Sequence, residues 1–128
     1  MDRDVSDLFR ALVEVGIVQA VRQEYQVFRS AGGDFVVFSP SNRGSSSFHM
    51  TFVQAEKVEA LGKMLTSDGV TSGSLMKDKR LEVVFGSGEK VAKRFDLLVA
   101  LYVLTALGKA EMEKSGRTLV FSKRRNEG

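Results

Sequence analysis

The side chains of this chain that could do chemistry are aromatic and basic, and they repeatedly stand next to one another. Examples are Phe28 with Arg29, the segment Lys93–Phe95, and Phe121 followed by Lys123–Arg125. Aromatic rings stack on unpaired bases at about 1–3 kcal/mol each, while Lys and Arg contact the phosphates and release counterions. The pattern therefore predicts binding of single-stranded nucleic acid with little sequence preference.

The predicted nucleic-acid-binding residues share ring or cationic side chains in segments expected to lie on or beside a sheet. They are Tyr25, Phe28, Arg29, Phe35, Phe38, Arg43, Phe48, Lys79, Arg80, Lys90, Lys93 and Arg94. Among these, Arg29, Arg43, Lys79 and Arg80 are expected to flank an exposed aromatic face. Lys90 and Lys93 are the cations that would meet an anion held at the start of a helix.

The segment Phe35–Phe38 (FVVF) carries the most specific inference. Neighbouring residues of a strand point to opposite faces, and all four residues here are apolar, so both faces of the strand are hydrophobic. Either another element or subunit covers the second face, or that face is a binding platform. The sequence leaves open which of Tyr25 and Phe28, or of Phe35 and Phe38, points to it.

The composition argues against most enzyme classes. The 128 residues include no Cys and a single His, His49, which excludes a thiolate nucleophile, a disulfide, Cys-ligated metal centres and a multi-histidine site. The turn Gly86–Lys90 before a helix could hold a phosphate on its backbone N–H groups, with Ser87 at the turn. However, it lacks the Gly-Lys-Ser/Thr ending of a P-loop and the third glycine of a dinucleotide motif. We therefore expect no enzymatic activity and no catalytic residue, cofactor or metal site. An enzyme that uses this turn ranks third among the hypotheses, after the two binding hypotheses given below.

Charge and length predict one domain spanning residues 1–128. Residues 1–72 carry seven basic and nine acidic groups, whereas residues 73–128 carry twelve and seven, so the net charge of +3 conceals +5 in the C-terminal part. The start Met1–Asp4 has no signal-peptide pattern, and no stretch approaches the roughly 18 apolar residues of a spanning helix. We expect a cytoplasmic protein without a membrane segment. Sparse Asn and Gln and the absence of Cys suit a thermophile.

The hydrophobic periodicity predicts an α+β fold with a largely antiparallel sheet of four to five strands and about three helices. The predicted strands are 25–30, 35–38, 48–52, 70–75, 81–85 and 117–123. The predicted helices are 5–13 with a continuation over 17–24, one from a capping box at Thr51 to about residue 67, and 89–107.

Turns and loops are expected between these elements. Gly32-Gly33 turns a hairpin, although a helix ending at Gly32 is the competing interpretation. Residues 39–47 form a flexible loop, 77–80 a charged turn, 109–116 a connection and 124–128 a frayed tail. The helix 89–107 is expected at the centre of the core, with Phe85 and Phe95 as core side chains. Strands and helices do not alternate, which disfavours a doubly wound parallel sheet.

In overall arrangement the chain resembles the ThermoDBP-type single-stranded DNA-binding proteins of thermophilic archaea. The residues that carry the resemblance are Tyr25, Phe28, Arg29, Phe35, Phe38, Lys79, Arg80, Lys93 and Arg94. It implies a hydrophobic, aromatic cleft edged by basic residues and single-stranded DNA as the partner. RNA is the other nucleic-acid partner considered. The alternative hypothesis is a structural or protein-interaction module, a homodimer whose apolar strand face a partner covers.

Overall fold

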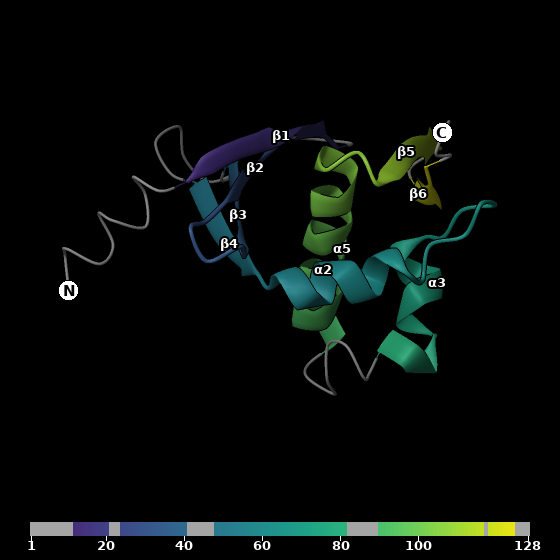
Figure 1. Cartoon of the computed structure of the whole chain (residues 1–128). Helices are drawn as coiled ribbons and strands as arrows, with labels where there is room; N and C mark the ends of the chain where they lie inside the picture. The colour runs from purple at the N-terminus through teal and green to yellow at the C-terminus, as the bar shows by residue number, and fades with distance from the viewer. Residues whose placement is uncertain (1–11, 21–23, 41–47, 82–89, 117, 125–128) are drawn as a thin grey trace.

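The structure, a computed structural model, describes residues 12–20, 24–40, 48–81, 90–116 and 118–124. Its strands are β1 (Val13–Gln19), β2 (Glu24–Arg29), β3 (Phe35–Pro40), β4 (Phe48–Val53), β5 (Ala110–Ser115) and β6 (Thr118–Lys123). Its helices with described bounds are α2 (Ala55–Gly62), α3 (Ser72–Met76) and α5 (Lys90–Ala106). Strands β1–β4 form an antiparallel sheet in sequence order, and β5 pairs with β6 (Figure 1). The α+β prediction is confirmed.

The core lies between the inner face of the four-stranded sheet and α5. Helix α5 contacts each of the four strands as well as α2, α3 and β5, and Figure 1 shows it between the sheet and α3. Its middle, from Leu97 to Leu104, is almost wholly buried, as predicted for a central helix. The rings of Tyr25 on β2 and Tyr102 on α5 have centroids 4.4 Å apart. Burying these side chains supplies the main stabilisation of the fold.

The hairpin of β2 and β3 forms where the sequence predicted it. The Ser30 N–H donates to the Asp34 carbonyl oxygen over 2.8 Å, and the Gly33 N–H donates to the Ser30 carbonyl oxygen over 3.0 Å. Gly33 has φ of 93°, a left-handed conformation that glycine adopts without a steric penalty. The competing interpretation, a helix ending at Gly32, is wrong.

Helix α2 is capped from the hairpin rather than by its own N-cap residue. The side chain of Gln54 makes no capping hydrogen bond, and the Ala55 N–H donates instead to Asp34 Oδ1 over 2.9 Å. An acidic side chain at a helix N-terminus also complements the helix dipole. This contact joins the β2–β3 turn to the start of α2. The predicted capping box at Thr51 is wrong because Thr51 pairs with Val37 in the sheet.

The C-terminus of α5 ends in a Schellman motif. The Gly108 N–H donates to the Thr105 carbonyl oxygen over 3.1 Å, and the Lys109 N–H donates to the Leu104 carbonyl oxygen over 3.0 Å. Gly108 has φ of 76°, as this motif requires. The sharp reversal sends the chain into β5, a strand that the sequence prediction left as a connection.

Strand β6 is tied to the segment after α2. Val70 and Phe121 exchange two backbone hydrogen bonds of 2.7 and 2.8 Å, and the Lys123 N–H donates to the Thr66 carbonyl oxygen over 2.9 Å. The last predicted strand is therefore confirmed for Thr118–Lys123, while Arg117 lies outside the described residues.

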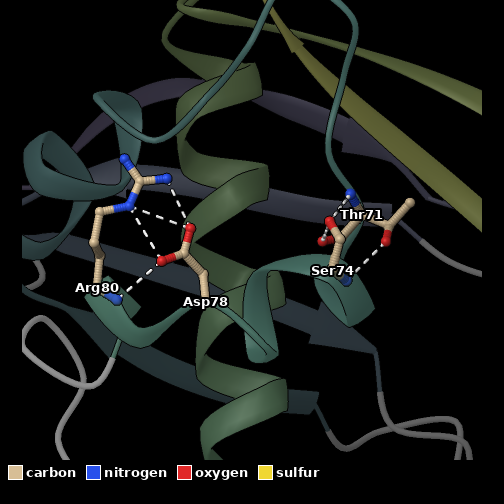
Figure 2. A network of polar contacts seen from close by, with 4 residues as sticks. All are labelled: Thr71, Ser74, Asp78 and Arg80. Atoms are coloured by element: carbon tan, nitrogen blue, oxygen red, sulfur yellow. Dashed lines mark hydrogen bonds and ion pairs between the residues drawn. The ribbon is translucent and has the colours of Figure 1, made fainter.

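Two further sequence predictions fail in the described part of the chain. Val13 and residues 17–19, predicted to be helical, lie in strand β1, because pairing with β2 outweighs a three- and four-residue apolar spacing that a strand also tolerates. The predicted strand 70–75 is helix α3 apart from the single bridge at Val70. Thr71 and Ser74 cap α3 reciprocally, each side-chain oxygen accepting the other's backbone N–H over 3.0 Å (Figure 2).

Several predicted features fall partly or wholly outside the described residues. They are the predicted helix 5–13 up to residue 11, its continuation at 21–23, the loop at 41–47, most of the strand 81–85, the turn 86–88 and the tail from residue 125. Ser39 and Pro40, predicted to begin the loop, end β3, and residues 79–81 are helical where a turn and a strand start were expected. Phe85 lies outside the described residues. Phe95 was wrongly assigned to the core, since 42% of it is exposed.

Candidate nucleic-acid interface

The face of the four-stranded sheet turned away from α5, here called the outer face, carries aromatic side chains. Phe28, Val36 and Phe52 are register partners on three adjacent strands and therefore share this face. Phe38 joins them, its ring edge-on to that of Phe28 with centroids 5.5 Å apart. Val36 is 1% exposed yet is not part of the main core cluster, so the outer face has a small apolar cluster of its own.

The outer face is apolar and partly open, but its described charges are acidic. Ile17 is 55% exposed and Phe52 60%, and Met50 is exposed as well. Glu14 and Glu24 lie on the same face by register, and none of its described residues is Lys or Arg. The second face is thus apolar, as predicted, but none of the cations expected beside it is found there among the described residues.

The basic side chains gather instead in a hollow on the opposite side of the sheet. We call it the basic groove. Its volume is about 1040 Å³, and it lies between the β2–β3 turn, α2, the C-terminal end of α5 and the β5–β6 hairpin. Its charged lining residues are Arg29, Lys63, Lys109, Lys123, Arg124, Glu59 and Glu111.

Each cation of the basic groove lies at the end of a helix or strand, next to a turn, a cap or a hydrogen bond between segments. Arg29 ends β2 beside the turn that caps α2, and Lys63 is the C-cap residue of α2. Lys109 follows the Schellman glycine of α5. Lys123 is held beside the segment after α2 by its hydrogen bond to Thr66, and the Arg124 N–H donates to the Lys109 carbonyl oxygen over 3.4 Å.

The electrostatics of the basic groove favour an anion. Five cations line it against two carboxylates. Among the described residues, none of these five cations forms an ion pair. Arg124 Nη1 donates to the Gly108 carbonyl oxygen over 3.4 Å, and the Arg29 guanidinium carbon lies 5.1 Å from the centroid of the Phe35 ring. Cations that approach one another without carboxylate partners create a positive potential that attracts phosphate groups.

The structure separates the predicted aromatic residues. Tyr25 and Phe35 lie in the core, 7% and 3% exposed, so their predicted role in stacking on bases is corrected. Phe28 and Phe38 lie on the outer face and are half-buried. Phe48 begins β4, and its side chain lies outside the description.

The predicted cations are separated as well. Arg29 lines the basic groove. Lys79 and Arg80 follow α3, which lies on the far side of α5 from the sheet, so they do not flank the outer face (Figure 1). The three cations of the first turns of α5 are described for the backbone only, and Arg43 lies outside the described residues. The three are Lys90, Lys93 and Arg94.

Arg80 is engaged by an acidic neighbour. Its Nη2 lies 2.7 Å from Asp78 Oδ2, and its Nε contacts both carboxylate oxygens (Figure 2). These hydrogen bonds lower the pKa of Asp78, and the same bonds raise the pKa of Arg80. Arg80 is therefore a weaker candidate for phosphate than the cations of the basic groove, which form no ion pair with a described residue.

Four cations of the basic groove are absent from the predicted binding residues: Lys63, Lys109, Lys123 and Arg124. Lys123 and Arg124 do belong to the pattern of neighbouring aromatic and basic residues in the sequence. The excess positive charge after residue 72 was the signal that pointed to three of them. Across the described residues, no group of three or more His, Asp or Glu side chains is arranged to hold a metal ion. No helix in the described parts of the chain is long and apolar enough to cross a membrane.

Comparison of the chain with protein-family models, curated proteins and solved structures finds no match. The resemblance to ThermoDBP-type proteins therefore stays a prediction, and a functional proposal has to come from the two surfaces themselves.

Proposed function

We propose that the protein is a non-enzymatic single-stranded nucleic-acid binding protein whose basic groove holds the phosphate backbone. The observation that carries the proposal is the convergence of five cations, free of ion pairs with described residues, in one hollow. Lys and Arg that neutralise phosphates release condensed counterions, and this release supplies most of the affinity in binding without sequence preference.

The concave form of the basic groove supports a single strand over a duplex. A single strand is flexible and can follow a hollow bounded by two hairpins and two helices, whereas duplex DNA is stiff, with a persistence length of about 150 base pairs. Proteins that read a duplex usually insert a helix or strand pair into one of its grooves. The basic groove receives a ligand rather than inserting into one.

The binding mode differs from the one that the sequence suggested. The sequence hypothesis combined stacking on the sheet with contacts to phosphates on one surface. In the structure five described cations line the basic groove, while the exposed Ile17, Met50 and Phe52 lie on the outer face with Glu14 and Glu24. We therefore assign most of the binding affinity to contacts between the cations of the basic groove and phosphates.

The test is fluorescence anisotropy with labelled single-stranded and duplex oligonucleotides of equal length at two salt concentrations. We expect the single strand to bind more tightly and its affinity to fall as salt rises. DNA and RNA oligonucleotides of the same sequence are compared in parallel. No binding at low salt, or equal binding of single strand, duplex and heparin, would contradict the proposed function.

A second candidate function, self-association as a homodimer, rests on the exposure of Ile17, Met50 and Phe52 on the outer face. Four strands about 4.8 Å apart and six residues long at about 3.3 Å per residue present roughly 400 Å². Stable interfaces bury about 800 Å² per partner, so this face alone supports only a weak dimer. Sedimentation over a concentration series tests it, with Phe52→Lys as the variant that should abolish any dimer.

A further inference from the structure

Arg29 differs from the other cations of the basic groove because a buried aromatic ring lies beneath it. Arg29 and Phe35 are register partners across β2 and β3, and the guanidinium carbon lies 5.1 Å from the ring centroid. Phe35 is 3% exposed and belongs to the core cluster, whereas Arg29 is exposed. The ring is thus fixed from below while the cation above it faces solvent.

This contact restricts where the Arg29 guanidinium can go. A cation over an aromatic ring gains about 0.5–1 kcal/mol at an exposed site, which reduces the freedom of an otherwise mobile side chain. The guanidinium is planar and stacks on flat partners, a property that the ammonium groups of Lys63, Lys109 and Lys123 lack. Among the cations of the basic groove, Arg29 alone has a described ring contact.

The described lining of the basic groove offers an unpaired base no exposed aromatic side chain. Phe35 is the single aromatic residue among the described residues that line the groove, and its ring is buried. Proteins that bind single strands stack bases on aromatic side chains or on guanidinium planes. In this groove the second option is the one that the structure provides.

We propose that Arg29, supported by Phe35, is the residue of the basic groove that stacks on a nucleobase, while the other four cations contact phosphates. This inference rests on the proposed function. It assigns the chemical class of ligand more narrowly: a strand with unpaired bases rather than any polyanion. It also explains how the groove could prefer single strands, since the faces of paired bases are covered by their neighbours in a duplex.

The test compares an oligothymidylate with an abasic strand of equal length and charge, using wild type and Arg29→Lys. The wild type is expected to bind the base-bearing strand about tenfold more tightly, within the range of one base–side-chain stacking contact. Arg29→Lys keeps the charge and loses the plane, so its two affinities should be nearly equal and its salt dependence unchanged. Lys114→Arg is the matched control, because it makes the reverse exchange at an exposed position outside the basic groove, and it should retain the wild-type preference.

A second variant tests whether the Phe35 ring is needed to hold Arg29 in place. Phe35→Leu keeps the buried position apolar but removes the ring under Arg29, and circular dichroism checks that it folds. It should reduce the preference for bases as Arg29→Lys does. If this variant fails to fold, the Arg29→Lys comparison still decides the matter.

The outcomes separate the two proposals. If neither strand binds the wild type at low salt, the proposed function and this inference both fail. If the wild type binds both strands equally, the basic groove holds phosphates and the stacking role of Arg29 is refuted. A preference for bases that survives in Arg29→Lys refutes that role in the same way.

Discussion

Two lysines from different elements, Lys63 and Lys123, give the sharpest test of the basic groove. Replacing both by Gln leaves three of its five cations. For single strands each neutralised phosphate contributes about −0.7 to the slope of log affinity against log salt concentration. If each of the four cations other than Arg29 meets one phosphate, the slope is about −2.8 for wild type and about −1.4 for the double variant.

These slopes convert into measurable affinities. Between about 50 and 200 mM salt the wild type should lose about 50-fold in affinity and the double variant about sevenfold. Anisotropy titrations of a labelled oligothymidylate across that range give both slopes. Neither lysine side chain lies in the core, so thermal unfolding should be nearly unchanged.

The matched control is Lys77→Gln combined with Lys114→Gln. Both residues are exposed and outside the basic groove, and this pair of substitutions lowers the net charge by the same amount. If binding depends on the groove, the control keeps a slope close to that of the wild type. Equal slopes for the two double variants would refute the reasoning, because binding would then follow net charge rather than the arrangement of these side chains.

Three further expectations follow from the same structure. Glu59→Gln combined with Glu111→Gln removes both carboxylates from the basic groove, so the affinity for a single strand should rise severalfold at low salt. An unchanged affinity in the anisotropy titration would count against binding in the basic groove. Gly69 has φ of 98°, and a Cβ there would meet a side-chain carbon 2.5 Å away, so Gly69→Ala should lower the free energy of unfolding, measured in urea, by about 1–3 kcal/mol. The control is Gly73→Ala, at a helical position with space for a Cβ, which should lose little stability. Equal losses in the two variants would contradict the structure. Burial, with a smaller contribution from Tyr25, raises the pKa of Tyr102. The folded state therefore keeps a proton that the unfolded chain releases near pH 10, and stability should fall above about pH 10 by up to about 1.4 kcal/mol per pH unit, a fall that Tyr102→Phe should reduce; an equally steep fall in the variant would show that another group is responsible.

The elements predicted correctly from the sequence are those fixed by residues close together in the chain. The hairpin around Gly33 and the buried helix α5 came directly from turn chemistry and periodicity. Strand β1 did not, because Val13 and Ile17 satisfy helical spacing and only pairing with β2 decides between the two structures. Strand β5 was missed because just Ala110 and Met112 of its six residues are apolar, and it forms through pairing with β6.

The candidate site was harder to predict for a geometric reason. Phe28 and Arg29 are adjacent in sequence, which suggested one surface that carries both rings and cations. In a strand, adjacent residues point to opposite faces, so the structure puts Phe28 on the outer face and Arg29 in the basic groove. The cations that do meet come from segments far apart in the chain, such as Lys63 and Lys109, and only the tertiary fold brings them together.

The hydrogen bond from Ala55 to Asp34 spans 21 residues and ties the β2–β3 turn to α2 beside the basic groove, which Gly33 and Ala55 line. Its consequence is that one backbone amide reports on the integrity of this site. Exchange of the Ala55 amide with deuterium requires the turn and the helix to separate, an opening that leaves α5 buried and is smaller than global unfolding. A strand bound across the junction should slow exchange at Ala55 while the amides in the middle of α5, which exchange only when the whole core opens, report the overall stability of the protein.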